Sequence, residues 1–82
     1  MLLRTAEEIA DGKLSILDGV RLLNKIRASN RLAGNDWDMI NGFESETDHI
    51  FDPLKMSAED LKYVSYMESH VIEFCERLLG RN

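Results

Sequence analysis

The sequence predicts a small all-α fold that forms one domain over residues 1–82, and three observations support this class. Helix-breaking residues are sparse, with one proline and five glycines. Apolar residues recur at helical spacing through two long stretches. No stretch alternates apolar and polar residues in the way a half-buried strand does. The expected architecture is a bundle of two long helices, a short first helix and one or two short helical turns between them.

The first helix is predicted from Thr5-Ala6-Glu7-Glu8, which has the T-x-x-E form of a capping box. Asp11-Gly12 closes this short helix. A start at Leu2 or Leu3 is the alternative.

The second helix follows Ser15 and runs from Ile16 to about Ala33, with Gly34 suited to the position after its last residue. Gly19 lies in the middle of the apolar arc of this helix. Because a glycine inside a helix costs about 1 kcal/mol relative to alanine, we expect another helix to approach closely at Gly19.

The last helix begins at Ser57-Ala58-Glu59-Asp60, a further capping signal, and ends at Gly80. Pro53 blocks a continuous helix from the preceding segment. The apolar residues of the last helix share one broad arc: Leu61, Val64, Met67, Val71, Ile72, Phe74, Cys75, Leu78 and Leu79.

The segment between Gly34 and Pro53 has a looser pattern. Asp36 can cap a short helix that carries Trp37, Met39 and Ile40, and Asn41-Gly42 indicates a turn. Ser45-Glu46-Thr47-Asp48 can cap a single helical turn that ends at Phe51.

Two charged residues fall inside apolar arcs, Arg27 in the second helix and Glu68 in the last. A buried charge costs several kcal/mol unless it is paired. We therefore expect Glu68 to meet Arg27, or another arginine such as Arg21 or Arg4, across the helix interface.

Length and composition limit the functions that this chain can have. Its 82 residues support only a thin core, so a large cofactor cavity is not expected and no cofactor is predicted. The net charge of −5 argues against nucleic acid as the main partner.

No apolar run approaches the roughly 20 residues of a membrane span, and no apolar leader follows Met1. No membrane association is expected. The single cysteine, Cys75, cannot form an internal disulfide, which favours a reducing, cytoplasmic location.

Charge is distributed unevenly along the chain. Residues 1–31 hold six basic and four acidic side chains, residues 32–54 hold six acidic and no basic ones, and residues 55–82 hold four basic and five acidic ones. The acidic middle segment also holds half of the six aromatic residues. Clustered carboxylates with interleaved aromatics suit recognition of a basic protein, because charge steers the encounter and aromatic rings supply contact energy.

The candidate partner-binding residues are therefore the charged and aromatic side chains of the middle segment. The aromatic anchors would be Trp37, Phe43 or Phe51. An alternative interpretation is that this segment is a solvated connection whose aromatic rings face the core. The complete candidate set is Asp36, Trp37, Asp38, Phe43, Glu44, Glu46, Asp48, His49, Phe51 and Asp52.

A metal site formed by Glu44, Glu46, Asp48, Asp52 and His49 is a further alternative, since carboxylates and imidazole are metal ligands. The spacing of an EF-hand and the H-E-x-x-H arrangement are both missing, so no metal is predicted. No nucleophile elbow or phosphate-binding loop occurs either, and we predict a protein without enzymatic activity.

Two local resemblances involve the middle segment. Ser45-Glu46-Thr47-Asp48-His49-Ile50, after the helix start Ile16-Leu17-Asp18-Gly19-Val20-Arg21, resembles a group of small uncharacterised bacterial helical proteins with an S-E-T-D-H motif. The likeness covers about two thirds of the chain. It implies a helical fold and no particular activity.

Asp48-His49-Ile50-Phe51-Asp52-Pro53 is similar to the short third helix of the colicin nuclease immunity proteins, which reads Asp-Leu-Ile-Tyr-Tyr-Pro. Asp48, Ile50 and Pro53 match, and Phe51 replaces the first tyrosine, whereas His49 and Asp52 depart from the pattern. Those proteins are small acidic four-helix bundles that neutralise a basic nuclease toxin.

The combined expectation is a bacterial, cytoplasmic, toxin-neutralising immunity or inhibitor protein that binds a basic partner such as a toxin domain. The alternative is a small structural or regulatory subunit. Such a subunit could be a homodimer that buries apolar helix surface against a second copy.

Overall fold

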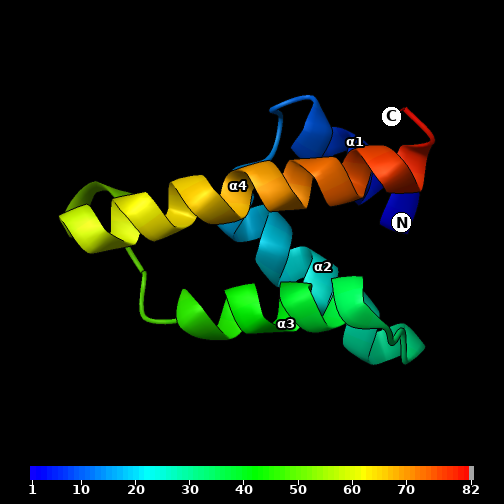
Figure 1. The fold of residues 1–82 in the computed structure, drawn as a ribbon, viewed down its shortest axis with the longest axis horizontal. Helices are drawn as coiled ribbons and strands as arrows, with labels where there is room; N and C mark the ends of the chain where they lie inside the picture. The colour runs from blue at the N-terminus through cyan, green and yellow to red at the C-terminus, as the bar shows by residue number, and fades with distance from the viewer. Residues whose placement is uncertain (82) are drawn as a thin grey trace.

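The computed structural model describes residues 1–81, and all regular secondary structure in that range is helical, with no strand. This confirms the all-α class. Four α-helices and one short 3₁₀ helix follow one another along the chain (Figure 1). They are α1 (Leu2–Ala10), α2 (Ile16–Asn30), α3 (Asn35–Glu46), η1 (Pro53–Lys55) and α4 (Ala58–Leu79).

Helix α4 runs along the long axis of the molecule, which measures 33 × 24 × 19 Å (Figure 1). Helix α1 packs against α4 and α2, and α2 also packs against α3. The connection that contains η1 lies at the end of the molecule where α4 begins, away from the N-terminus (Figure 1). Within residues 1–81, no helix is both long enough and apolar enough to span a bilayer.

The ends of α4 agree with the prediction from sequence. Ser57 and Asp60 form a reciprocal capping box at its start, and Gly80 ends it in the left-handed conformation with a φ of 71°. At the start of α2, the Ser15 side chain accepts a hydrogen bond from the Asp18 backbone N–H. These ends are fixed by local hydrogen bonds, which is why sequence reasoning locates them.

The predicted capping box at Thr5 does not form. Helix α1 begins at Leu2, so Thr5 lies inside it and is buried in the core. The alternative start at Leu2 is the correct one. Packing of the first turn against the core extends the helix past the local capping signal.

The boundary between α2 and α3 also differs from the prediction. Helix α2 ends at Asn30, where Arg31 adopts the left-handed conformation with a φ of 52°. Gly34, expected after the end of α2, instead precedes α3 with a φ of 122°. The prediction that Gly34 lies at a turn of the backbone is correct, but this turn precedes α3 and does not end α2.

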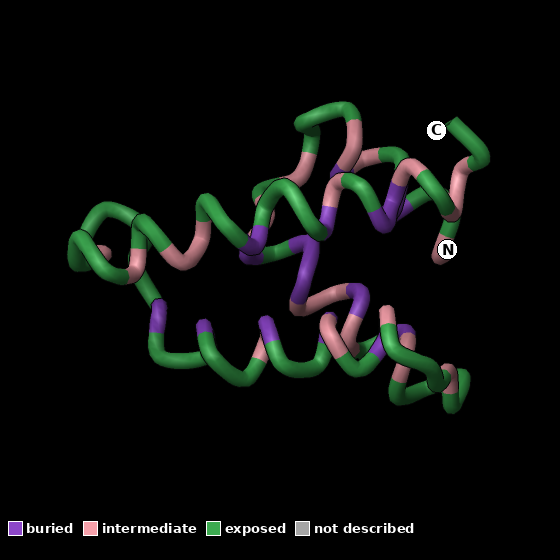
Figure 2. The backbone as a smooth tube through the Cα atoms, in the orientation of Figure 1, coloured by how far each residue is buried: buried purple, intermediate pink, exposed green. Residues whose placement is uncertain are grey.

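The middle segment forms a full helix of 12 residues in place of short pieces. Trp37, Ile40, Phe43 and Thr47 recur at helical spacing and are all buried, so the core selects one continuous helix. The buried stretches of α3 face α2 and α4 (Figure 2). The expected turn at Asn41-Gly42 and the expected helical turn ending at Phe51 are therefore both wrong.

The close approach predicted at Gly19 is confirmed. A Cβ atom added at Gly19 would lie 2.7 Å from both Cγ1 and Cδ1 of Ile9, a buried residue of α1. The absence of a side chain at Gly19 is what allows α1 and α2 to pack at this distance.

The expected buried ion pair of Glu68 is absent among residues 1–81. Glu68 is exposed, and the Arg27 side chain hydrogen-bonds Asn24 and Asn41 instead. The half-buried Arg21 reaches the backbone after α3. Glu68 lies at the edge of the buried face of α4, beside a surface hollow at the connection between α1 and α2, and so reaches solvent.

The thiol of Cys75 should react slowly in the folded protein. Burial raises its pKa to about 11, so the nucleophilic thiolate is scarce at pH 8. A disulfide exchange reagent at pH 8 should label Cys75 slowly in buffer and at once in denaturant. Equal rates in both conditions would contradict the buried placement.

Candidate partner-binding surface

The connection between α3 and α4 is held against α2 by one arginine. Helix α3 ends at Glu46, and the hydroxyl of the next residue, Thr47, donates to the Phe43 carbonyl at 2.7 Å. Arg21 Nη2 donates to the carbonyl of Ile50 at 2.6 Å and to that of Thr47 at 3.3 Å. The Thr47 carbonyl also accepts from the Ile50 N–H at 3.1 Å, so Arg21 holds a backbone turn that directly follows α3. A cation at this position also complements the negative end of the helix dipole.

This anchoring orients two consecutive apolar residues in opposite directions. Ile50 is buried in the core, whereas 90% of the Phe51 surface is exposed. The backbone of Phe51 is therefore attached to a fixed residue, while its ring projects into solvent.

The second half of the connection is closed by local hydrogen bonds. The Asp52 carboxylate accepts from the Leu54 N–H at 3.0 Å, and η1 begins at Pro53. His49 Nε2 lies 2.9 Å from Asp60 Oδ1 and so joins the connection to the first turn of α4. The hydrogen bond with His49 and that from the Ser57 backbone N–H lower the pKa of Asp60. The Asp60 carboxylate is therefore ionised at neutral pH and can accept the hydrogen bond from His49.

Three apolar side chains lie exposed at this end of the molecule. Leu54 is 94% exposed and Leu61 is 52% exposed, in addition to Phe51. Residues 58–66 of α4 include no buried residue, so this end of the helix has little cover. We call this region the Phe51 surface and define it by Asp48, Phe51, Asp52, Leu54, Lys55 and Leu61.

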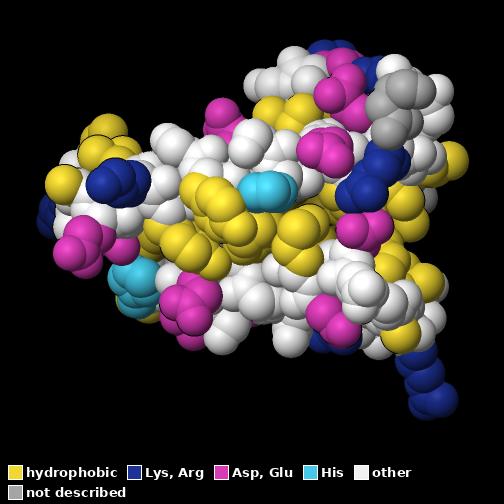
Figure 3. All heavy atoms as spheres, in the orientation of Figure 1, with side chains coloured by type: hydrophobic (Ala, Val, Ile, Leu, Met, Phe, Trp, Pro, Cys, Tyr) yellow, Lys and Arg dark blue, Asp and Glu magenta, His cyan; other side chains and the backbone are white. Residues whose placement is uncertain are grey.

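A hollow of about 370 Å³ adjoins the ring of Phe51. Figure 3 shows hydrophobic, acidic and basic side chains side by side at this end of the molecule. The hollow is lined by His49, Ile50, Phe51, Asp52, Lys55, Met56 and Asp60.

Two of the three predicted aromatic anchors lie in the core, which corrects the expectation that either could contact a partner. Trp37 is buried with its ring centroid 5.0 Å from that of Phe74, in an edge-to-face arrangement. Phe43 is buried against Tyr63, with ring centroids 6.2 Å apart. The alternative interpretation of the segment therefore holds for these two rings.

The four predicted carboxylates of α3 do not form one patch. Asp36 and Asp38 are two positions apart, as are Glu44 and Glu46, so within each pair the side chains project about 160° apart. Asp36 is paired with Arg77 Nη2 at 3.1 Å. Among the predicted acidic residues, only Asp48 and Asp52 lie in the connection that carries Phe51.

Sequence reasoning missed Leu54, Lys55 and Leu61 as parts of the Phe51 surface, and Asp60 as part of the hollow beside it. Leu61 was assigned to the buried arc of the last helix, which its periodicity fits. Leu54 follows Pro53 and belongs to no apolar arc of a predicted helix. A leucine outside every such arc was the feature of the sequence that could have indicated an exposed apolar side chain.

The alternative of a metal site has no support in the geometry. Within the described part of the chain, no three side chains of histidine, cysteine, aspartate or glutamate come together as a group that could hold an ion.

A comparison with protein-family models, with curated proteins and with solved structures finds no match. The segment Asp48–Pro53, which resembles the third helix of immunity proteins, forms a turn and an extended connection in this chain, with only Pro53 inside a 3₁₀ helix.

Proposed function

We propose that this chain is a non-enzymatic protein-binding module that uses the Phe51 surface to hold a basic partner. The observation that carries the proposal is the exposure of the Phe51 ring on a connection whose backbone is fixed by Arg21. Because the backbone that carries the ring is already held, binding has to order only the side chain, which limits the loss of conformational entropy.

The partner would present an apolar pocket for Phe51 surrounded by basic side chains. Asp48 and Asp52 flank the ring in sequence and are exposed. Exposed carboxylates around an apolar anchor raise the association rate with a basic protein and orient it. Lys55 at the edge of the same surface would face an acidic group of the partner.

Within this class, we propose the role of a toxin-neutralising inhibitor in a bacterial cytoplasm. The support is the resemblance at Asp48–Pro53, the small acidic helical fold and the net charge of −5. The expected target is a basic toxin domain, which the exposed ring and carboxylates would cover.

Replacing Phe51 with serine should abolish capture of the partner without affecting the fold. Loss of an aromatic hot spot costs about 2–4 kcal/mol of binding free energy, at least about a 30-fold loss of affinity. The free energy of unfolding should change by less than about 0.5 kcal/mol, since the ring is exposed. Affinity chromatography from lysate, followed by titration of the captured protein, measures the loss of binding, and urea unfolding measures the change in the free energy of unfolding.

Charge reversal provides the matched control. Asp48→Lys should weaken binding and Asp38→Lys should not, although both carry the same change in net charge. Asp38 lies on α3, on the side opposite Ile40. If Phe51→Ser and Asp48→Lys retain the captured proteins of the unmodified chain, the Phe51 surface is not an interface.

The alternative occupant of this surface is a second copy of the chain. The surface carries both carboxylates and Lys55, so it could pair with itself about a two-fold axis. Sedimentation equilibrium distinguishes the two cases: a dimer that dissociates on Phe51→Ser favours self-association, and a monomer favours the basic partner.

A further inference from the structure

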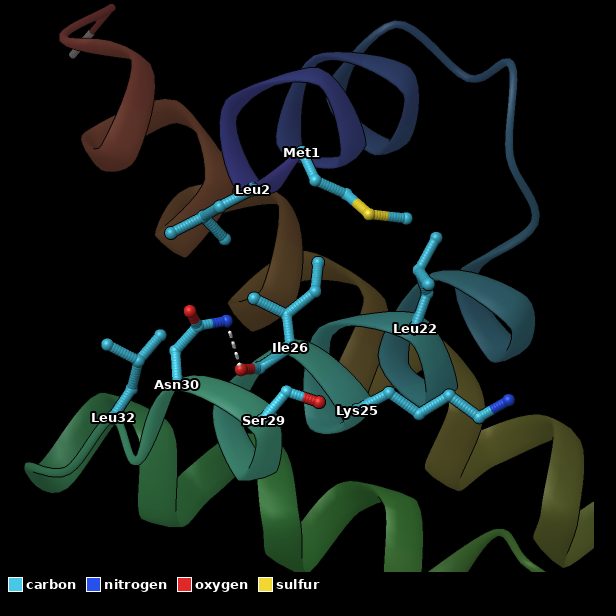
Figure 4. A pocket seen from close by; sticks show the side chains of 8 residues that line it. All are labelled: Met1, Leu2, Leu22, Lys25, Ile26, Ser29, Asn30 and Leu32. Atoms are coloured by element: carbon cyan, nitrogen blue, oxygen red, sulfur yellow. Dashed lines mark hydrogen bonds between the residues drawn. The ribbon is translucent and has the colours of Figure 1, made fainter.

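An apolar groove lies between α1 and α2, away from the Phe51 surface. Its volume is about 500 Å³, within the range of about 300–1,000 Å³ that small-molecule sites occupy. Figure 4 shows Met1 and Leu2 of the α1 end on one side of the groove, and Leu22 and Ile26 of α2 on the facing side. Leu32 closes one end.

The chemistry of the lining is specific in two respects. The apolar side chains are aliphatic and unstacked, with no aromatic ring among them, which suits a flexible chain more than a planar ligand. Lys25 is the one charged side chain of the lining, and no carboxylate of residues 1–81 lies within ion-pair distance of it. The groove therefore combines an apolar body with a lysine at its edge.

The two polar residues beside Lys25 differ in their availability. The Asn30 amide already donates to the Ile26 carbonyl at 2.9 Å, as the dashed line in Figure 4 shows. The hydroxyl of Ser29 is exposed at the groove and can donate to a ligand. Lys25 and Ser29 lie four residues apart and so on the same side of α2, where they can bind one anionic group together.

We propose that this groove binds a free unbranched carboxylate with a long alkyl chain. The chain would lie along Leu2, Leu22 and Ile26, and the carboxylate would pair with Lys25 and Ser29 at the exposed edge. Each methylene that leaves water contributes about 0.8 kcal/mol, so affinity should rise with chain length until the groove is filled. The site does not depend on the Phe51 surface and would give the protein a second, small-molecule ligand.

Titration with dodecanoate below its micellar concentration tests the proposal. Chemical-shift changes of backbone amides should saturate and should map to residues 22–32 and the start of α1. Lys25→Glu should weaken binding by about tenfold or more, because an ion pair is lost and a repulsion is introduced. The neutral probe 1-dodecanol should bind more weakly than dodecanoate.

Two pairs of variants separate the groove from general effects. Lys62→Glu makes the same charge change at the far end of α4 and should leave the affinity unchanged within about twofold. Ser29→Trp should block the groove, whereas Ala28→Trp places the same ring at an exposed position that does not line it.

Three outcomes would overturn the proposal. They are shifts that do not saturate, shifts that map to the Phe51 surface, and equal dodecanoate affinity in Ser29→Trp and Ala28→Trp. If binding saturates but Lys25→Glu and Lys62→Glu weaken it equally, Lys25 does not bind the carboxylate. This result would contradict the proposal that the ligand is anionic.

Discussion

Replacing Trp37 with alanine is expected to destabilise the folded protein by about 3–5 kcal/mol. Trp37 is buried and packs edge-to-face on Phe74, so its removal loses apolar burial and leaves a cavity between α3 and α4. A chain of 82 residues has a total stability of roughly 4–12 kcal/mol, so this loss is a large part of it. Urea unfolding followed by circular dichroism measures the difference.

Two further variants make this result interpretable if Trp37→Ala fails to fold. Trp37→Phe keeps an aromatic ring in the core and should cost less than Trp37→Ala. Phe51→Ala removes a ring of the same segment and should change stability by less than about 0.5 kcal/mol. Similar losses for Trp37→Ala and Phe51→Ala would contradict the assignment of one ring to the core and the other to the surface.

Replacing Gly19 with alanine should destabilise the fold by about 1–3 kcal/mol, although alanine is the better helix former. The new Cβ would lie 2.7 Å from two atoms of the Ile9 side chain, so α1 and α2 must move apart or Ile9 must change rotamer. Ile9 is β-branched and buried, which restricts that change. Thermal unfolding of the variant should begin at a lower temperature.

The matched control for this effect is Gly42→Ala in α3. A Cβ atom at Gly42 has no neighbour within 4 Å, so only the helix propensity changes. Gly42→Ala should therefore stabilise the fold by about 0.5–1 kcal/mol. If both substitutions stabilise the protein, the interface between α1 and α2 is looser than described.

The parts of the fold that the sequence predicts are those decided by local contacts. The capping box of Ser57 and Asp60 and the left-handed Gly80 each depend on one residue and its neighbours in the chain. The contact at Gly19 joins two helices, and it was predicted because a glycine inside a helix costs stability unless another element approaches it closely. The start of α1 and the continuity of α3 were missed because the core determines them. The burial of Thr5 and Phe43 outweighs a capping signal in one case and a turn signal in the other.

The candidate surface was predicted only in part, for a similar reason. Phe51, Asp48 and Asp52 were identified from composition, and the structure leaves them exposed. Trp37 and Phe43 were included because composition does not show the direction of a side chain. Leu61 was excluded because periodicity cannot show that the first turns of α4 lack a covering helix.

Crosslinking from position 51 tests the proposed interface most directly. A photoreactive phenylalanine in place of Phe51 should form an adduct with one basic protein in the lysate of the source organism. The same group at the exposed position 28 of α2 should not. The adduct should be lost when Asp48→Lys is added. Absence of an adduct at position 51, or the same adduct from positions 51 and 28, would contradict the proposal that the Phe51 surface holds a basic partner.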